Sequence, residues 1–150
     1  MDMINARPTE AAALVGVVGP ANHADGAVNS NWVEMSKFES IRATVFAGVL
    51  GVAATLDAKL EQATNASGAG AKDVTGKAIT QLVKATDDNK QAEINCRAEE
   101  LDVNGGFGFV RLVLTVGTAA SHAAAAIYGH NPRYAPASNY DLASVAEIVS

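Results

Sequence analysis

The chain has one cysteine, few aromatic residues and no excess of basic residues, and each shortage excludes a class of protein. Because Cys96 has no second cysteine to pair with, an internal disulfide is excluded, and a reducing compartment is allowed. Aromatic residues make up 5% of the 150 residues, so a core has to be built from Ala, Val, Leu and Ile. The net charge of -5 argues against a nucleic-acid partner, because such a surface normally carries a basic patch.

The start of the chain lacks the features of a secretion signal. The apolar run at residues 11–20 follows Asp2, Arg7 and Glu10, which do not form the basic segment that opens a signal peptide. The run is also too short, and too interrupted by glycine, to span a bilayer. We therefore expect residues 1–20 to form an N-terminal arm or a first strand, and we expect no membrane partner.

Alternating hydrophobicity dominates what is present. From residue 107 to residue 116, one set of alternate residues is apolar apart from Gly108, and the other set is mixed. Side chains of a strand point alternately to two faces, so this pattern predicts a strand with one face on a core. The same period runs through residues 41–49, 54–61 and 93–99. The residues expected to be buried are Leu56, Leu60, Ile94, Val110, Leu112 and Leu114.

Two further segments have a weaker pattern. Residues 78–83 are a short strand candidate, and residues 122–129, with four successive alanines, suit strand or helix by propensity. Gly129 and Pro132 allow no long helix there. Several short strands with turn residues between them predict an all-β protein, an antiparallel β-sandwich or barrel.

The domain organisation follows from where the alternation stops. We expect the sandwich to cover residues 21–130. Residues 131–150 contain two prolines and two tyrosines and show no long alternation, so they are predicted to form an extended C-terminal tail. Such a tail is expected to bind a neighbouring subunit.

Two segments approach a ligand-binding motif without its spacing. Residues 70–78 have five residues between their glycines where a phosphate loop has four, and alanine follows Lys77 where that motif has serine or threonine. A loop entering a strand is the preferred interpretation. His23, His122 and His130 share no metal-ligand spacing, so we expect no metal and no cofactor.

Candidate catalytic residues are also unconvincing. Ser121 and His122 are adjacent, and adjacent side chains of a strand point apart, so they do not suit a nucleophile and its base. The three carboxylates of residues 99–102 are interpreted as a solvated strand end beside a turn. Cys96 shares the apolar face of residues 94–98, which predicts a buried or half-buried core thiol and not a nucleophile. We therefore expect no catalytic residues and no enzyme.

Three segments together resemble small virion proteins of tailed phages. They are "NSNWVEMSKFESI", "GVAATLDAKLEQATNASGAGAKDVTG" and "GFGFVRLVLTVGTAASHAAAAIYGHNPRYAP", and the resemblance covers residues 27–136. The chain is similar to the capsid cement, or decoration, proteins of tailed bacteriophages. The resemblance implies a jelly-roll-like sandwich with extended terminal arms, which binds the outside of the major capsid shell and staples neighbouring capsomers. It also implies a homodimer or homotrimer on the virion, assembled in the host cytoplasm.

Two alternatives stay open. One is a head–tail connector or tail component, and the other is a carbohydrate-binding β-sandwich on the virion. An exposed aromatic platform of Trp32, Tyr128, Tyr134 or Tyr140 would favour carbohydrate binding.

The chain ends are expected to carry the contacts with other subunits. Residues 1–20 and 130–150 contain apolar residues that have weak claims to the sandwich core. Large aromatic residues dominate interface energetics, and apolar residues near the C-terminus would otherwise be left in water. For Trp32 and Phe38, closure of the sandwich core is an equally weighted alternative. The predicted interface residues are Trp32, Phe38, Tyr134, Tyr140, Val145, Ile148 and Val149.

Overall fold

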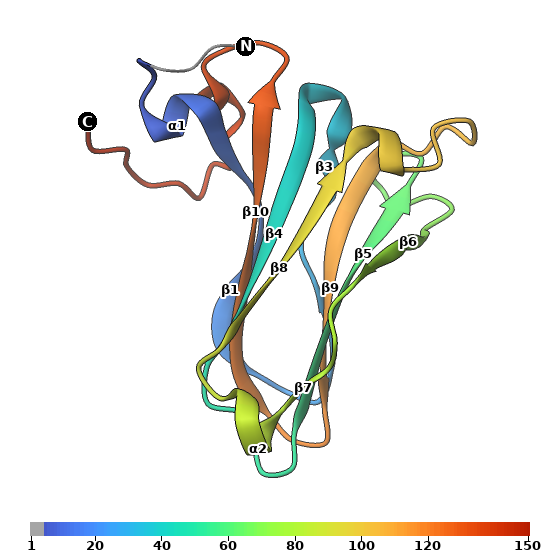
Figure 1. Cartoon of the computed structure of the whole chain (residues 1–150), viewed down its shortest axis with the longest axis vertical. Coiled ribbons are helices and arrows are strands. Elements are labelled where there is room, and N and C mark those ends of the chain that lie inside the picture. Colours follow the sequence, from blue (N-terminus) through green and yellow to red (C-terminus); the bar gives the residue numbers. More distant parts are fainter. Residues whose placement is uncertain (1–4) are drawn as a thin grey trace.

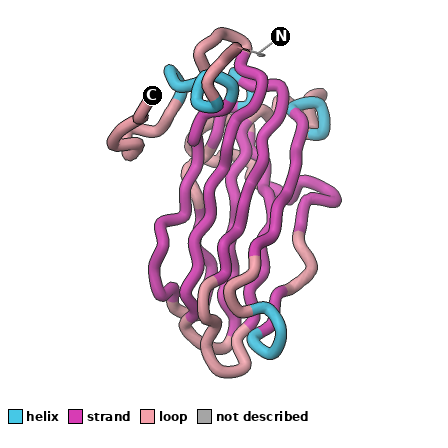
Figure 2. The backbone as a smooth tube through the Cα atoms, turned by 60° about the vertical axis from the view of Figure 1, so that its left-hand side comes forward, coloured by secondary structure: helices cyan, strands magenta, loops and turns pink. Residues whose placement is uncertain are grey.

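The computed structural model describes residues 5–150, and it shows two antiparallel sheets packed face to face (Figures 1 and 2). Residues 1–4, the beginning of the expected arm, lie outside the described residues. Sheet A has the strand order β1 (Ala12–His23), β10 (Ser121–Pro132), β4 (Phe38–Ala47) and β8 (Gln91–Arg97). Sheet B has the order β2 (Gly26–Asn29), β9 (Phe109–Gly117), β5 (Thr55–Ala63) and β6 (Lys72–Ala78).

Short elements complete the two sheets. The strand β3 (Val33–Glu34) pairs with β9, and β7 (Leu82–Val83) pairs with β5. The remaining elements are the helices α1 (Pro8–Ala11) and α2 (Lys84–Asp87) and the 3-10 turns η1 (Met35–Lys37), η2 (Ala98–Glu100) and η3 (Ala137–Tyr140).

The strand pairing is that of a jelly roll. Among the eight main strands in chain order, the first pairs with the last (β1 with β10) and the second with the seventh (β2 with β9). The third pairs with the sixth (β4 with β8), and the fourth with the fifth (β5 with β6). Such nested antiparallel pairs, rolled into two sheets, define the eight-strand jelly roll. The predicted all-β, jelly-roll-like antiparallel sandwich is therefore confirmed.

The core lies between the sheets and follows the alternation of the sequence. Leu60 of β5 lies opposite Leu112 of β9, and both side chains are fully buried. All six residues predicted to be buried are buried. Every second side chain of β5 from Leu56 to Gln62 is buried, because the side chains of a strand project alternately to the two faces of the sheet.

The alanine run forms a strand, β10, and the small residues explain its position between β1 and β4. Ala123 and Ala125 face the core, and Gly129 lies opposite Ile41 of β4. A Cβ atom at Gly129 would lie 2.6 Å from the Phe38 ring. The absence of a side chain at Gly129 is thus what allows the Phe38 ring to pack on the strand.

The expectation that residues 1–20 have a weak claim to the core is wrong for their strand portion. Ala13, Val15 and Val18 of β1 are core residues. The pairing of β1 with β10 is interrupted by register shifts between Leu14 and Gly16 and between Val18 and Ala21. These irregularities break the two-residue period from which a strand is recognised in a sequence.

Two other boundaries need correction. Residues 78–83 do not form one strand, because β6 ends at Ala78 and β7 begins at Leu82. The loop expected at residues 70–78 does enter a strand, but earlier than expected, because β6 begins at Lys72. In β6 only Val74 is buried, so the strand carries no alternating signal.

The C-terminal region also contributes to the core. The strand β10 continues to Pro132, and Ala137 of η3 is fully buried. The expectation that residues 130–150 contribute little to the core is therefore wrong for the first part of this region.

Candidate docking surface

Both described ends of the chain lie at the same end of the sandwich, as Figure 1 shows. The C-terminal region is attached there to β1. The Leu14 N–H donates to Oδ1 of Asp141 at 2.8 Å, and the Leu142 N–H donates to the Leu14 carbonyl oxygen at 2.9 Å. These two bonds fix the point at which the last residues leave the sandwich.

Residues 143–150, called the C-terminal segment below, extend beyond this attachment. Val145 is half-buried, and its N–H donates to the Leu142 carbonyl oxygen at 3.0 Å. Ile148 is 41% exposed and Val149 is 84% exposed. The segment therefore presents branched apolar side chains to solvent from a fixed starting point.

Three of the predicted interface residues meet in one groove of about 250 Å³ beside this attachment. Trp32, Phe38 and Tyr140 line it together with Phe109 and Leu142. The Phe38 and Tyr140 rings pack edge to face, with their centroids 5.5 Å apart and an angle of 77° between their planes. This geometry joins η3 to the beginning of β4.

Phe38 is a core residue and not an interface anchor. It is only 5% exposed, so a partner gains almost no contact with it, and the alternative that it closes the core is the correct one. Tyr140 is half-buried, and Lys37 Nζ lies 5.5 Å from the centroid of its ring.

Trp32 packs on its own chain at the outer face of sheet B. The Arg111 guanidinium lies 4.5 Å from the centroid of the Trp32 rings, and Arg111 also pairs with Glu61 of β5. A Cβ atom at Gly68 would lie 2.8 Å from Nε1 of Trp32, and Gly68 has φ +83°, so glycine is required there. Trp32 is consequently half-buried.

Other exposed apolar residues lie at both ends of the sandwich. Tyr134, in the loop after β10, is 70% exposed. At the opposite end, Val52 in the loop from β4 to β5 is 84% exposed, with Val49 and Phe46 also exposed. Phe46 borders a shallow groove of about 370 Å³. The apolar run around Val49 and Val52 is the sequence signal that could have pointed to this second end.

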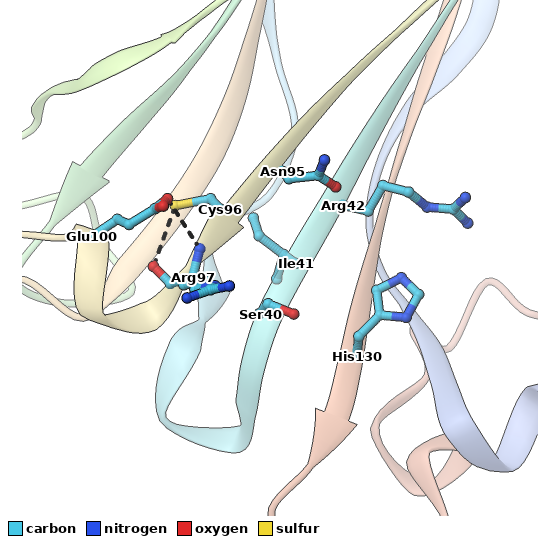
Figure 3. A pocket seen from close by; sticks show the side chains of 8 residues that line it. All are labelled: Ser40, Ile41, Arg42, Asn95, Cys96, Arg97, Glu100 and His130. Carbon is cyan, nitrogen blue, oxygen red and sulfur yellow. Dashed lines mark hydrogen bonds between the residues drawn. The ribbon is translucent and has the colours of Figure 1, made fainter. Parts of the chain in front are cut away.

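A polar pocket of about 620 Å³ lies on the outer face of sheet A (Figure 3). Burial and the neighbouring Arg42 lower the pKa of His130. A hydrogen bond from Lys77, whose Nζ lies 2.7 Å from Oε2, lowers the pKa of Glu100. No sequence pattern indicates this pocket, because its residues come from three strands and a turn that lie far apart along the chain. It is lined by Ser40, Ile41, Arg42, Asn95, Cys96, Arg97, Glu100 and His130.

The remaining candidate groups lie apart from one another. Cys96 is 1% exposed, as expected for a core thiol, and burial raises its pKa to about 11. Ser121 is buried and donates to the Ala119 carbonyl oxygen, whereas His122 is exposed on the other face of β10. Asp102 pairs with Lys72 at 2.7 Å.

Within residues 5–150, no three His, Cys, Asp or Glu side chains gather as they would around a metal ion. No helix in this part of the chain is long and apolar enough to cross a membrane.

Comparison with known proteins gives general likenesses of fold. No family model matches the chain, and no curated protein matches its sequence. A chain of the cryo-EM structure of Broad Bean Stain Virus is 9% identical, with a TM-score of 0.45 over 89% of this chain and 96% of that chain. A chain of an empty Cowpea Mosaic Virus particle is 11% identical, with a TM-score of 0.39 over 87% and 89%.

A carbohydrate-binding domain gives a likeness of the same order. The CBM22-1 xylan-binding domain from Paenibacillus barcinonensis Xyn10C is 9% identical, with a TM-score of 0.39 over 81% of this chain and 92% of that domain. Since one fold carries many functions, the function is argued from this chain's own surface.

Proposed function

We propose that the chain is a structural virion protein that binds the outside of the major capsid shell through its C-terminal segment. The observation that carries the proposal is that segment, fixed to β1 at Leu142 and exposing Ile148 and Val149. Burying apolar surface stabilises association by about 25 cal/mol per Å², less the cost of ordering the segment. The fixed attachment lowers that cost, because the segment starts from one position.

The exposed residues at the opposite end support a role in stapling neighbouring capsomers. Val49 and Val52 offer a second apolar surface at the opposite end of the sandwich from the C-terminal segment. A rigid sandwich with apolar residues at both ends suits contact with two subunits at once. The resemblance of residues 27–136 to cement proteins makes the major capsid protein the proposed partner and a homodimer or homotrimer the proposed form. It also supports a place on the virion surface after assembly in the host cytoplasm.

Aromatic carbohydrate binding is the weaker alternative, because Trp32 and Tyr140 line one groove but Tyr128 and Tyr134 lie outside it, and the rings pack on other side chains of the chain. Trp32 packs against Arg111 over sheet B. Tyr128 lies on the outer face of sheet A, where the Arg42 guanidinium is 5.2 Å from its ring centroid. Tyr140 packs on Phe38. The head–tail connector alternative differs from the main proposal only in where the chain lies on the particle.

Deletion of residues 143–150 tests the proposal. The shortened chain should keep its melting temperature, because Ile148 and Val149 lie outside the core, and its affinity for virus particles should fall about tenfold or more. The double change of Ile148→Ser and Val149→Ser should have the same effect in co-sedimentation with particles. Val103→Ser is the matched control, since Val103 is 61% exposed in a different loop. Unchanged particle binding by both variants would refute attachment through this segment.

A further inference from the structure

The register of sheet A places six side chains in two rows on its outer face. In the first row His130 lies opposite Ser40, and Ser40 opposite Arg97. Directly opposed residues of an antiparallel pair project from the same face of the sheet, so each row lies on one side of it. The second row contains Tyr128, Arg42 and Asn95. Five of the six, all except Tyr128, line the pocket of about 620 Å³, called the Arg42–His130 pocket below.

Two polar groups of this pocket have no hydrogen-bond partner among residues 5–150. Nε of Arg42 and Nε2 of His130 are both buried and make no hydrogen bond. The contact of Arg42 with Glu93 is long, 3.4 Å from Nη1 to Oε1. Buried polar groups in folded proteins nearly always have partners, so an unpaired donor needs an explanation. Figure 3 shows Arg42 and His130 on the β10 side of the pocket, with Arg97 and Glu100 on the β8 side.

The Arg42 side chain is free to turn toward a ligand. It is 41% exposed, and it is held by a long, exposed ion pair and by the Tyr128 ring 5.2 Å from its guanidinium, two contacts that are each weak at an exposed site. An oxyanion beside it would accept hydrogen bonds from Nε and one Nη atom together, in the forked geometry that arginine offers to carboxylates. His130 would supply a further hydrogen bond from Nε2.

The charges around the pocket do not repel an anion, because every carboxylate beside it is paired with a cation. Arg42 and Arg97 line it, and the charge of Glu100 is compensated by Lys77 at 2.7 Å. The pairing of Arg97 with Glu99 is 3.3 Å long, and both side chains are more than two-thirds exposed, so it is weak. Arg42, Arg97 and Lys77 therefore balance Glu93, Glu99 and Glu100 here, whereas the whole chain has a net charge of -5.

The volume of the pocket and its neutral polar side chains indicate a ligand larger than a simple ion. A pocket of about 620 Å³ lies within the range of small-molecule sites and is far larger than one carboxylate. Ser40 and Asn95 add a hydroxyl and an amide, which suit the hydroxyl groups of a sugar. We propose that the Arg42–His130 pocket binds a carboxylated saccharide, with the carboxylate on Arg42 and His130 and the hydroxyls toward Ser40 and Asn95. The site is separate from the C-terminal segment, so either proposal stands if the other fails.

Nuclear magnetic resonance of the ¹⁵N-labelled full-length chain tests this site. Galacturonate is added at constant ionic strength while the Nε–H signal of Arg42 is followed, with galactose and acetate as matched ligands. Galacturonate should shift the signal to saturation, and galactose and acetate should each bind about tenfold more weakly or less, because each lacks part of the recognised chemistry. Equal binding of galactose would refute the role of the arginine. Equal binding of acetate would refute saccharide recognition, and no shift with any of the three would refute the site.

Substitutions separate specific recognition from general charge. Arg42→Lys keeps the positive charge but removes Nε–H and the forked geometry, so affinity for galacturonate should fall about tenfold. Arg7→Lys, at an exposed position outside the sandwich, is the matched control and should bind as the unaltered chain does. His130→Ala provides a second variant that leaves Arg42 in place, and it should weaken binding severalfold. Wild-type affinity in both Arg42→Lys and His130→Ala would overturn the proposal.

Discussion

The two outer faces of the sandwich each carry a central arginine, and the two arginines differ in their surroundings. On sheet B, Arg111 donates from Nε at 2.9 Å and from Nη2 at 2.8 Å to Oε1 of Glu61. On sheet A, Nε of Arg42 has no hydrogen-bond partner in the described part of the chain, and Nη1 makes a long contact of 3.4 Å with Glu93. The arginine on sheet B is therefore hydrogen-bonded to a carboxylate through Nε, whereas Nε of the arginine on sheet A is left for another partner.

The neighbours of the two arginines extend the contrast. Beside Arg111, Lys59 pairs with Asp73 at 2.8 Å and Gln81 donates to Asp57 at 2.8 Å. Beside Arg42, the imidazole of His130 has an unpaired buried nitrogen. A face whose polar groups satisfy one another stabilises the sandwich, whereas a face with unpaired donors has interactions left for a ligand.

The largest effect should come from neither outer face but from the core behind Arg111. Leu112 is fully buried on the inner side of β9, so Leu112→Ala removes packing between the sheets. We expect the free energy of unfolding to fall by about 2–5 kcal/mol, measured by chemical denaturation. A loss below about 1 kcal/mol, typical of a surface change, would mean that the sheets do not pack as described.

The next largest effect should be a difference in unfolding free energy between alanine substitutions of the two arginines. Arg111→Ala leaves Glu61, whose side chain is 17% exposed, without its partner and uncovers Trp32, so it should cost about 1–3 kcal/mol. Arg42→Ala removes a long, exposed ion pair and the contact with the Tyr128 ring, and it should cost about 1 kcal/mol or less. Equal costs in the same denaturation experiment would remove the contrast between the faces.

A smaller effect on stability is expected at low pH, from Asp88, a carboxylate that is paired within the fold as Glu61 is. Hydrogen bonds from Lys84 and from the Leu50 N–H lower the pKa of Asp88. A lowered folded pKa means that the stabilisation is complete above the unfolded value of 3.8 and is lost as the pH falls through the lower folded value. Asp88→Asn should therefore flatten the fall in melting temperature below pH 3.8. An unchanged acid profile would show that Asp88 is not held this way.

The strands that the sequence predicted are those with one continuously buried face. In β5, β8 and β9 one set of alternate residues faces the core, and residues such as Leu56 and Ile94 are buried as expected. The strand β1 was ambiguous because its register shifts twice, and β6 was missed because only Val74 is buried in it. Alternation reports burial, so it misses strands that are irregular or solvated on both faces.

The candidate sites depended on information that one sequence does not hold. The exposed apolar residues of the C-terminal segment could be read from the sequence, and the structure adds the attachment at Leu142. Phe38 could not be assigned, because whether an aromatic residue is buried depends on what packs against it, here Gly129 and Tyr140. The Arg42–His130 pocket could not be found at all, because it exists only once three strands are aligned in register.

Attachment through the C-terminal segment is tested most directly by cross-linking from its end. In a Val149→Cys variant, a photoreactive group can be placed on the new thiol selectively, because Cys96 is 1% exposed and its pKa is raised to about 11. Illumination of virus particles carrying this protein should join residue 149 to the major capsid protein, and a Val103→Cys control should give no such product. Cross-links from residue 149 to other virion proteins alone, or none to the particle, would contradict attachment to the capsid shell through this segment.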